Sequence, residues 1–149
     1  MDKFTILNIK DCNLVNMLIS EKITGIAPTQ QVSIMFKGNN KFIDFNDYSA
    51  AEHYIKEKIA IIPNWIEETG SYIGTRNIYP NYMTSHSLCW DIERCIKESG
   101  LEDKYLEQLK SLCFADKNID LSISENLFKL IHTTTENKCL ASLLTVLCD

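Results

Sequence analysis

The chain has 149 residues, of which 45% are hydrophobic and 23% charged, with only 5 Gly and 3 Pro. This composition is typical of a soluble globular protein, and the length allows one domain to bury a core without a metal or disulfides. We therefore expect a single globular domain over residues 1–149, with little room for disordered linker.

The formal net charge is −5, because 20 acidic residues outnumber 15 lysines and arginines. Among the basic residues only Arg76 and Arg94 are arginines, the side chain that binds phosphate and guanine through two parallel hydrogen bonds. Affinity for nucleic acid comes mostly from neutralising phosphates, so we expect no direct nucleic-acid binding. The acidic balance instead favours a basic protein partner.

No targeting or membrane segment is predicted. The amino-terminal sequence MDKFTILNIKD lacks the charged and then apolar pattern of a signal peptide. The longest apolar run, residues 139–148, is half the length of a membrane span. We expect a cytoplasmic protein without membrane association.

The amino-terminal third of the chain predicts strands around one helix. Residues 3–9 alternate and contain β-branched side chains, so they predict a strand. Asp11 is the expected N-cap of a helix that ends before Gly25. Residues 31–36 and 41–45 predict the two strands of a hairpin.

The turn of this hairpin, KGNN at residues 37–40, is the strongest turn signal in the sequence. Gly38, Asn39 and Asn40 are the residue types that tolerate positive φ, as tight hairpin turns require. The two flanking runs are therefore expected to pair antiparallel.

The middle of the chain predicts a helix, a short helical turn and a loop. Ser49 and Glu52 form an S-x-x-E capping box before a helix that ends at Pro63. Residues 64–70 (NWIEETG) predict a short helical turn that closes on a glycine. Residues 71–84 contain a glycine, a proline and three tyrosines without a clear period, so we expect an irregular loop that carries function.

Everything after Ser85 is predicted to be helical. The first helix has a buried stripe formed by Leu88, Cys89, Ile92, Cys95 and Ile96. Later capping boxes are predicted at Ser99 with Glu102, Ser122 with Glu125, and Thr133 with Glu136. The side chains expected to face inward on the later helices include Tyr105, Leu109, Leu112, Cys113, Leu127, Leu130, Ile131, Leu140 and Leu144.

This order of elements predicts an α+β fold. The expected sheet is small and mostly antiparallel, built from the amino-terminal strand plus the hairpin 31–45, and the carboxy-terminal half is helix-rich. An all-α fold with a hairpin appendage is the alternative.

No complete catalytic or metal-binding signature is present. The six cysteines include no C-x-x-C pair, so we interpret them as packing residues in a reducing compartment and expect no metal and no cofactor. His53 has a polar helix position, and His132 begins an H-x-T tripeptide without the second copy that two-histidine phosphoesterases use. We expect no catalytic residue, although a small hydrolase or nuclease using His86 or His132 is an open alternative.

The aromatic residues are the best candidates for a binding surface. Trp90 is predicted to lie opposite the buried stripe of its helix, covered either by the tyrosine loop 71–84 or by another protein. Tryptophan and tyrosine are enriched as interface anchors. The predicted partner-binding residues are Trp65, Glu67, Glu68, Tyr72, Arg76, Tyr79, Tyr82, Trp90, Asp91 and Glu93.

The sequence therefore favours a non-catalytic protein-binding module. Its most concrete form is an immunity or antitoxin-type inhibitor that covers the active site of a basic, nuclease-like toxin. A viral or phage inhibitor of a host factor would use the same physical interactions. A small enzyme and a structural or assembly subunit are the alternatives.

Overall fold

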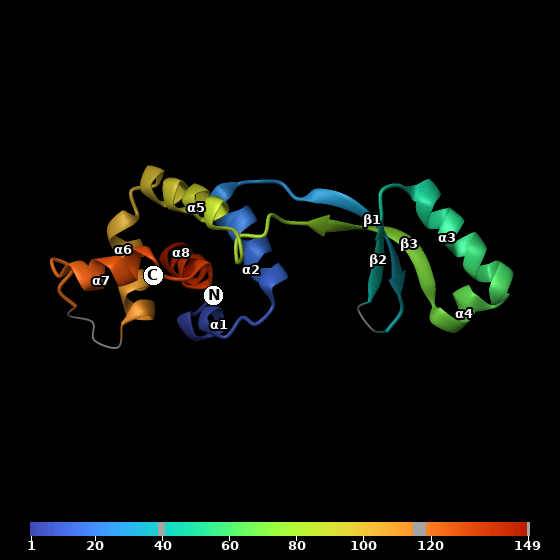
Figure 1. Ribbon diagram of the computed structural model, residues 1–149, viewed down its shortest axis with the longest axis horizontal. Helices are drawn as coiled ribbons and strands as arrows, with labels where there is room; N and C mark the ends of the chain where they lie inside the picture. Colours follow the sequence, from blue (N-terminus) through green and yellow to red (C-terminus); the bar gives the residue numbers. More distant parts are fainter. Residues whose placement is uncertain (39–40, 115–118, 149) are drawn as a thin grey trace. The chain divides into compact units, whose positions relative to one another are not determined.

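The structure, a computed structural model, describes residues 1–38, 41–114 and 119–148 and separates into two compact units. The helical unit comprises Met1–Ala27 and Tyr79–Asp149, and the sheet unit comprises Pro28–Ile78 (Figure 1). The α+β class is confirmed, since a three-stranded antiparallel sheet is combined with a helical carboxy-terminal half. Whether these two units together form the single domain expected from the sequence stays a prediction.

Helix α8 forms the centre of the helical unit. Every residue from Cys139 to Thr145 is buried, because α1, α2, α5 and α6 all pack against this helix. Burial on all sides explains why α8 reads as a continuous apolar run. The elements of this unit are α1 (Lys3–Leu7), α2 (Cys12–Ile19), the π-helical segment η1 (Ser20–Thr24), α5 (His86–Glu98), α6 (Glu102–Cys113), α7 (Ser124–Ile131) and α8 (Thr135–Leu147).

The sheet unit packs two helices on one face of its sheet. Its core contains Ile34, Ala51 and Trp65, contributed by the central strand and by both helices. The strand order is β2-β1-β3, and both pairs are antiparallel. The elements are β1 (Thr29–Phe36), β2 (Phe42–Phe45), α3 (Tyr48–Ile61), α4 (Trp65–Thr69) and β3 (Ser71–Ile78).

The predicted hairpin is confirmed by the pairing of β1 with β2, in a register that places Ile34 opposite Ile43. Gly38 has φ +88°, the left-handed conformation expected at this turn. The predicted turn residues Asn39 and Asn40 lie outside the described residues.

The predicted amino-terminal strand is wrong, because residues 3–7 form helix α1. Asp2 caps this helix by accepting hydrogen bonds from the Thr5 amide at 2.9 Å and the Thr5 hydroxyl at 2.8 Å. Only Ile6 is buried, whereas Phe4 is 77% exposed. A short apolar run fits either a strand or one helical turn, and here the cap decides for the helix.

The predicted loop 71–84 is wrong over its first half, because residues 71–78 form the third strand, β3. All eight residues pair with β1, and Gly74 lies opposite Ser33. A Cβ at Gly74 would meet the Met35 methyl carbon at 3.4 Å, an ordinary van der Waals distance, so space alone does not require glycine here. Pro80 follows the strand and does not interrupt it.

Several predicted caps are displaced. Asp47, and not Ser49, caps α3 by accepting from the Ala50 amide at 2.8 Å. Thr134, and not Thr133, caps α8 by accepting from the Asn137 amide at 3.2 Å. The N-caps of α6 and α7 are Leu101 and Ile123, which make no side-chain cap, so the boxes predicted at Ser99 with Glu102 and at Ser122 with Glu125 are absent. Several polar residues precede each helix, and spacing alone does not select the one that caps it.

No helix within the described ranges has the length and hydrophobicity needed to cross a membrane.

Candidate functional site

The residues predicted to bind a partner are divided between the two units, so each set is a separate candidate surface. Those in the sheet unit are Trp65, Glu67, Glu68, Tyr72 and Arg76, and those in the helical unit are Tyr79, Tyr82, Trp90, Asp91 and Glu93.

Two of the predicted anchors are core residues. Trp65 is 8% exposed and makes edge-on contacts with Phe36 and Tyr54 at ring-centroid distances of 5.9 and 6.1 Å. Tyr82 is fully buried, and its hydroxyl is hydrogen-bonded to that of Thr24 at 2.8 Å. Both side chains stabilise their own unit, so neither is accessible to a partner in the folded protein.

The other predicted residues of the sheet unit lie at or near its surface. Arg76 donates two hydrogen bonds to Asp44, at 3.0 and 2.6 Å, and its guanidinium lies over the Phe42 ring at 3.9 Å. These contacts hold Arg76 against the sheet, and its bonds to Asp44 keep the pKa of that carboxyl below its usual value. Tyr72 is 55% exposed. Glu67 and Glu68 are exposed in the first turn of α4.

In the helical unit, Trp90 is a predicted anchor that the structure leaves accessible. Ser85 caps α5, and the buried positions Cys89, Ile92 and Ile96 turn the opposite side of this helix outward. Trp90 is consequently 71% exposed, as its helical position predicted. The alternative expectation that the tyrosine loop covers Trp90 is wrong.

An apolar groove of about 320 Å³ lies beside Trp90, between helices of the helical unit. Its lining residues are Trp90 and Glu93 on α5, Tyr105, Leu106 and Leu109 on α6, Leu127, Leu130 and Ile131 on α7, and Lys138 on α8. Leu127 is 43% and Ile131 57% exposed, so much of this apolar surface is in contact with solvent. Contiguous exposed apolar surface of this kind marks interaction sites more often than isolated exposed side chains do.

A polar cluster of Glu93, Tyr105 and Lys138 lies in this otherwise apolar groove. Glu93 Oε1 accepts a hydrogen bond from the Tyr105 hydroxyl at 3.3 Å and forms an ion pair with Lys138 Nζ at 2.9 Å. Burial, reinforced by the Glu93 carboxylate, raises the pKa of Tyr105 well above its ordinary value. The phenol therefore stays protonated and donates to Glu93, which fixes the carboxylate in place.

The sequence interpretation missed the groove because it assigned the apolar side chains of α7 to the core. Leu127 and Ile131 were expected to face inward, but only Leu130 of this helix is buried. Leu127, Phe128, Leu130 and Ile131 have the spacing of one ordinary amphipathic face, so periodicity gave no sign that most of them are exposed.

The three histidines lie on the surface. His53 is paired with Glu57 at 3.3 Å, and both side chains are more than half exposed. His132 stacks on Phe128 with ring centroids 4.1 Å apart, and His86 is exposed at the start of α5. Among the described residues no hydrogen bond joins a histidine to a thiol or a hydroxyl, the arrangement that activates a nucleophile.

All six cysteines are free, and they differ in burial. Cys12 is exposed, so the expectation that the cysteines serve as packing residues does not hold for it. Cys89 and Cys139 are buried as expected, and Cys89 donates to the Tyr82 carbonyl at 3.6 Å. A hydrogen bond with Cys89, together with burial, raises the pKa of the Cys139 thiol, so this thiol stays protonated. No group of three or more potential metal ligands occurs in the part of the chain that the structure describes.

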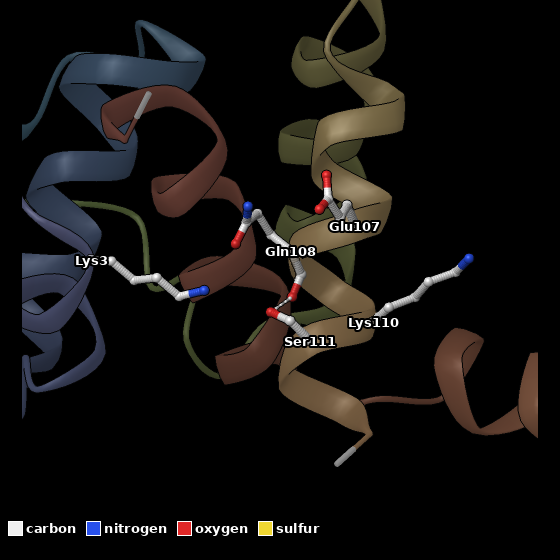
Figure 2. A pocket seen from close by; sticks show the side chains of 5 residues that line it. All are labelled: Lys3, Glu107, Gln108, Lys110 and Ser111. Atoms are coloured by element: carbon white, nitrogen blue, oxygen red, sulfur yellow. Dashed lines mark hydrogen bonds between the residues drawn. The ribbon is translucent and has the colours of Figure 1, made fainter. Parts of the chain in front are cut away.

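A smaller polar pocket, of about 110 Å³, lies between α1 and α6. Lys3 extends from α1 toward Gln108 and Ser111, whereas Lys110 extends away from them (Figure 2). Gln108 Oε1 is buried without a hydrogen-bond partner in the described residues, and the Ser111 hydroxyl donates to the Gln108 carbonyl at 2.7 Å. The pocket has room for a few water molecules, and one of them bound to Gln108 would satisfy the amide oxygen.

No family model, no curated protein and no solved structure matches this chain.

Proposed function

We propose that the chain is a non-catalytic protein-binding module whose docking surface is the groove beside Trp90. The observation that carries this proposal is the 71% exposure of Trp90 next to an open apolar groove. Burying a tryptophan and several aliphatic side chains against a partner supplies the central contacts from which most interfaces gain their affinity.

The charge of the chain supports a basic partner. Between residues 79 and 149 there are eleven acidic residues and only seven lysines and arginines, and the whole chain has a formal net charge of −5. A negative surface accelerates association with a positive one. The specific form that we propose is therefore an immunity-type inhibitor that acts in the cytoplasm and covers the active site of a basic, nuclease-like toxin. A phage or viral inhibitor of a basic host factor would dock in the same way.

The described residues offer little support for catalysis or for direct nucleic-acid binding. The three histidines are surface residues, and within the described part of the chain none of them is hydrogen-bonded to a thiol or a hydroxyl. The net negative charge with only two arginines offers little to a phosphate backbone.

Site-specific crosslinking tests the proposal. A photoreactive amino acid at position 90 should crosslink to a basic protein in an extract of the source cells, whereas the same group at position 4, where Phe4 is 77% exposed, should not. The purified partner should lose its enzymatic activity when the chain is added in equal amount. Its association rate should fall as salt rises from about 50 to about 300 mM, because screening shortens the range of the charges.

Two results would count against this function. One is a partner captured equally well from positions 90 and 4, since the groove would then have no special role. The other is a captured partner whose activity is unchanged by saturating amounts of the chain, which would exclude inhibition but leave simple binding in place.

A further inference from the structure

The groove beside Trp90 has features that define the chemistry of its occupant. Its walls come from α5, α6, α7 and α8, whose backbone groups are hydrogen-bonded within the helices. An extended peptide that binds as an added strand needs an open sheet edge, and these walls offer none. An amphipathic helix satisfies its own backbone and presents only side chains, so it matches walls that offer only side chains.

The polar cluster adds a charge requirement. Glu93 Oε1 is used by Tyr105 and Lys138, whereas no described residue bonds to Glu93 Oε2. Covering this carboxylate oxygen with an apolar surface would remove it from water without a replacement bond, which is unfavourable. An occupant that buries the groove must therefore supply a hydrogen-bond donor at this place.

The carboxylate, and not the amine, is the accessible member of the ion pair. The Glu93 side chain is 31% exposed, and that of Lys138 is 12% exposed. A lysine or arginine of the occupant thus reaches Glu93 more readily than an acidic side chain reaches Lys138. The excess of acidic residues between 79 and 149 acts in the same direction.

We infer that the occupant of the groove is an amphipathic α-helix of the partner, with an apolar face against Trp90, Leu127 and Ile131 and one lysine or arginine paired with Glu93. This inference rests on the proposed function and specifies the partner's binding element. Trp90 and the two α7 side chains supply the contact area, and Glu93 selects the sign of the charge.

Two synthetic peptides test the inference. The probes are helical peptides of roughly 14 residues, four turns, with leucine on one face and either lysine or glutamate on the other. Titration calorimetry with the intact chain should show that the lysine peptide binds about tenfold more tightly than the glutamate peptide. Trp90→Ala should weaken the binding of both peptides.

A matched pair of variants on α5 separates Glu93 from the general negative charge. Glu93→Gln should abolish most of the preference for the lysine peptide. Glu98→Gln removes an exposed carboxylate of the same helix that does not line the groove, and it should keep the preference. Far-UV circular dichroism of both variants checks that the helical unit is intact.

The outcomes are distinguishable. If both peptides bind at Trp90 with equal affinity, or if Glu93→Gln and Glu98→Gln reduce the preference equally, the role of Glu93 is overturned while the groove remains a docking surface. If neither peptide binds, or if Trp90→Ala has no effect on binding, the helical occupant is overturned. The crosslinking experiment then decides separately whether the chain binds a partner at all.

Discussion

The two units each contain one tryptophan, and the two side chains have opposite roles. In the sheet unit Trp65 is 8% exposed and packs between the strands and α3, whereas in the helical unit Trp90 is 71% exposed on the outer side of α5. The same residue type thus stabilises one unit and is free for binding on the other. The position of each tryptophan on its helix, and not the residue type, determines whether the side chain is buried or exposed.

The largest effect is expected at Trp65. Trp65→Ala should lower the free energy of unfolding of the sheet unit by about 3–5 kcal/mol, because a large buried side chain is removed and leaves a cavity. Trp90→Ala should change stability by less than about 0.5 kcal/mol. Urea unfolding followed by far-UV circular dichroism measures both changes, and equal destabilisation by the two substitutions would show that the two tryptophans do not differ in their structural role.

The next largest effect is expected inside the helical unit. Leu143 on α8 is fully buried, so Leu143→Ala should cost about 2–5 kcal/mol of stability. Leu127→Ala removes a side chain of the same type that is 43% exposed at the groove, and it should cost less than about 1 kcal/mol. Thermal unfolding of the two variants compares them directly. A larger loss for Leu127→Ala would mean that the groove is part of the core.

A helix cap should have a smaller effect. Asp47→Ala should destabilise the sheet unit by about 1 kcal/mol, because the Ala50 amide loses its acceptor. Ser49→Ala removes the residue that sequence spacing identified as the cap, and it should change stability by less than about 0.5 kcal/mol. Denaturant midpoints show which substitution destabilises the unit more. A larger loss for Ser49→Ala would show that Ser49, as predicted from spacing, is the cap.

The smallest effect is expected from the pH dependence of the sheet unit. The hydrogen bonds from Arg76 lower the pKa of Asp44 below 3.8, so this pair contributes stability at pH values above 3.8. That contribution is lost as the pH falls through the lowered pKa. In a Trp90→Phe background, Trp65 fluorescence reports on the sheet unit, and unfolding midpoints between about pH 6 and pH 3 should fall less steeply in Asp44→Asn. Identical pH profiles for Asp44→Asn and its parent would show that the Arg76–Asp44 pair adds no stability in solution.

Sequence reasoning found the elements whose signals are local. The hairpin of β1 and β2 followed from two β-type runs around a turn with glycine, and the exposure of Trp90 followed from its angle to Cys89, Ile92 and Ile96. These features depend on residues only a few positions apart.

Some errors concern features that depend on distant residues, and others concern a choice between competing local signals. Residues 71–78 had the β-branched and aromatic side chains of a strand, but the interior glycine favoured a loop, and the pairing with β1, more than thirty residues away, is not visible in the local sequence. Residues 3–7 became helical although their pattern also fits a strand. The groove depends on how α7 packs beside α5 and α6, so periodicity within one helix could not predict it.

We propose that the surface around Trp90 binds a protein. The dissociation constant of the partner that crosslinking identifies should be measured for three forms of the chain: wild type, Trp90→Ala and Phe4→Ala. Both substitutions remove an aromatic side chain that is more than two thirds exposed, but only the first lies at the groove. We expect Trp90→Ala to raise the dissociation constant about 30-fold, as for a central interface anchor, and Phe4→Ala to leave it unchanged. An unchanged dissociation constant for Trp90→Ala would show that the partner does not bind at the groove.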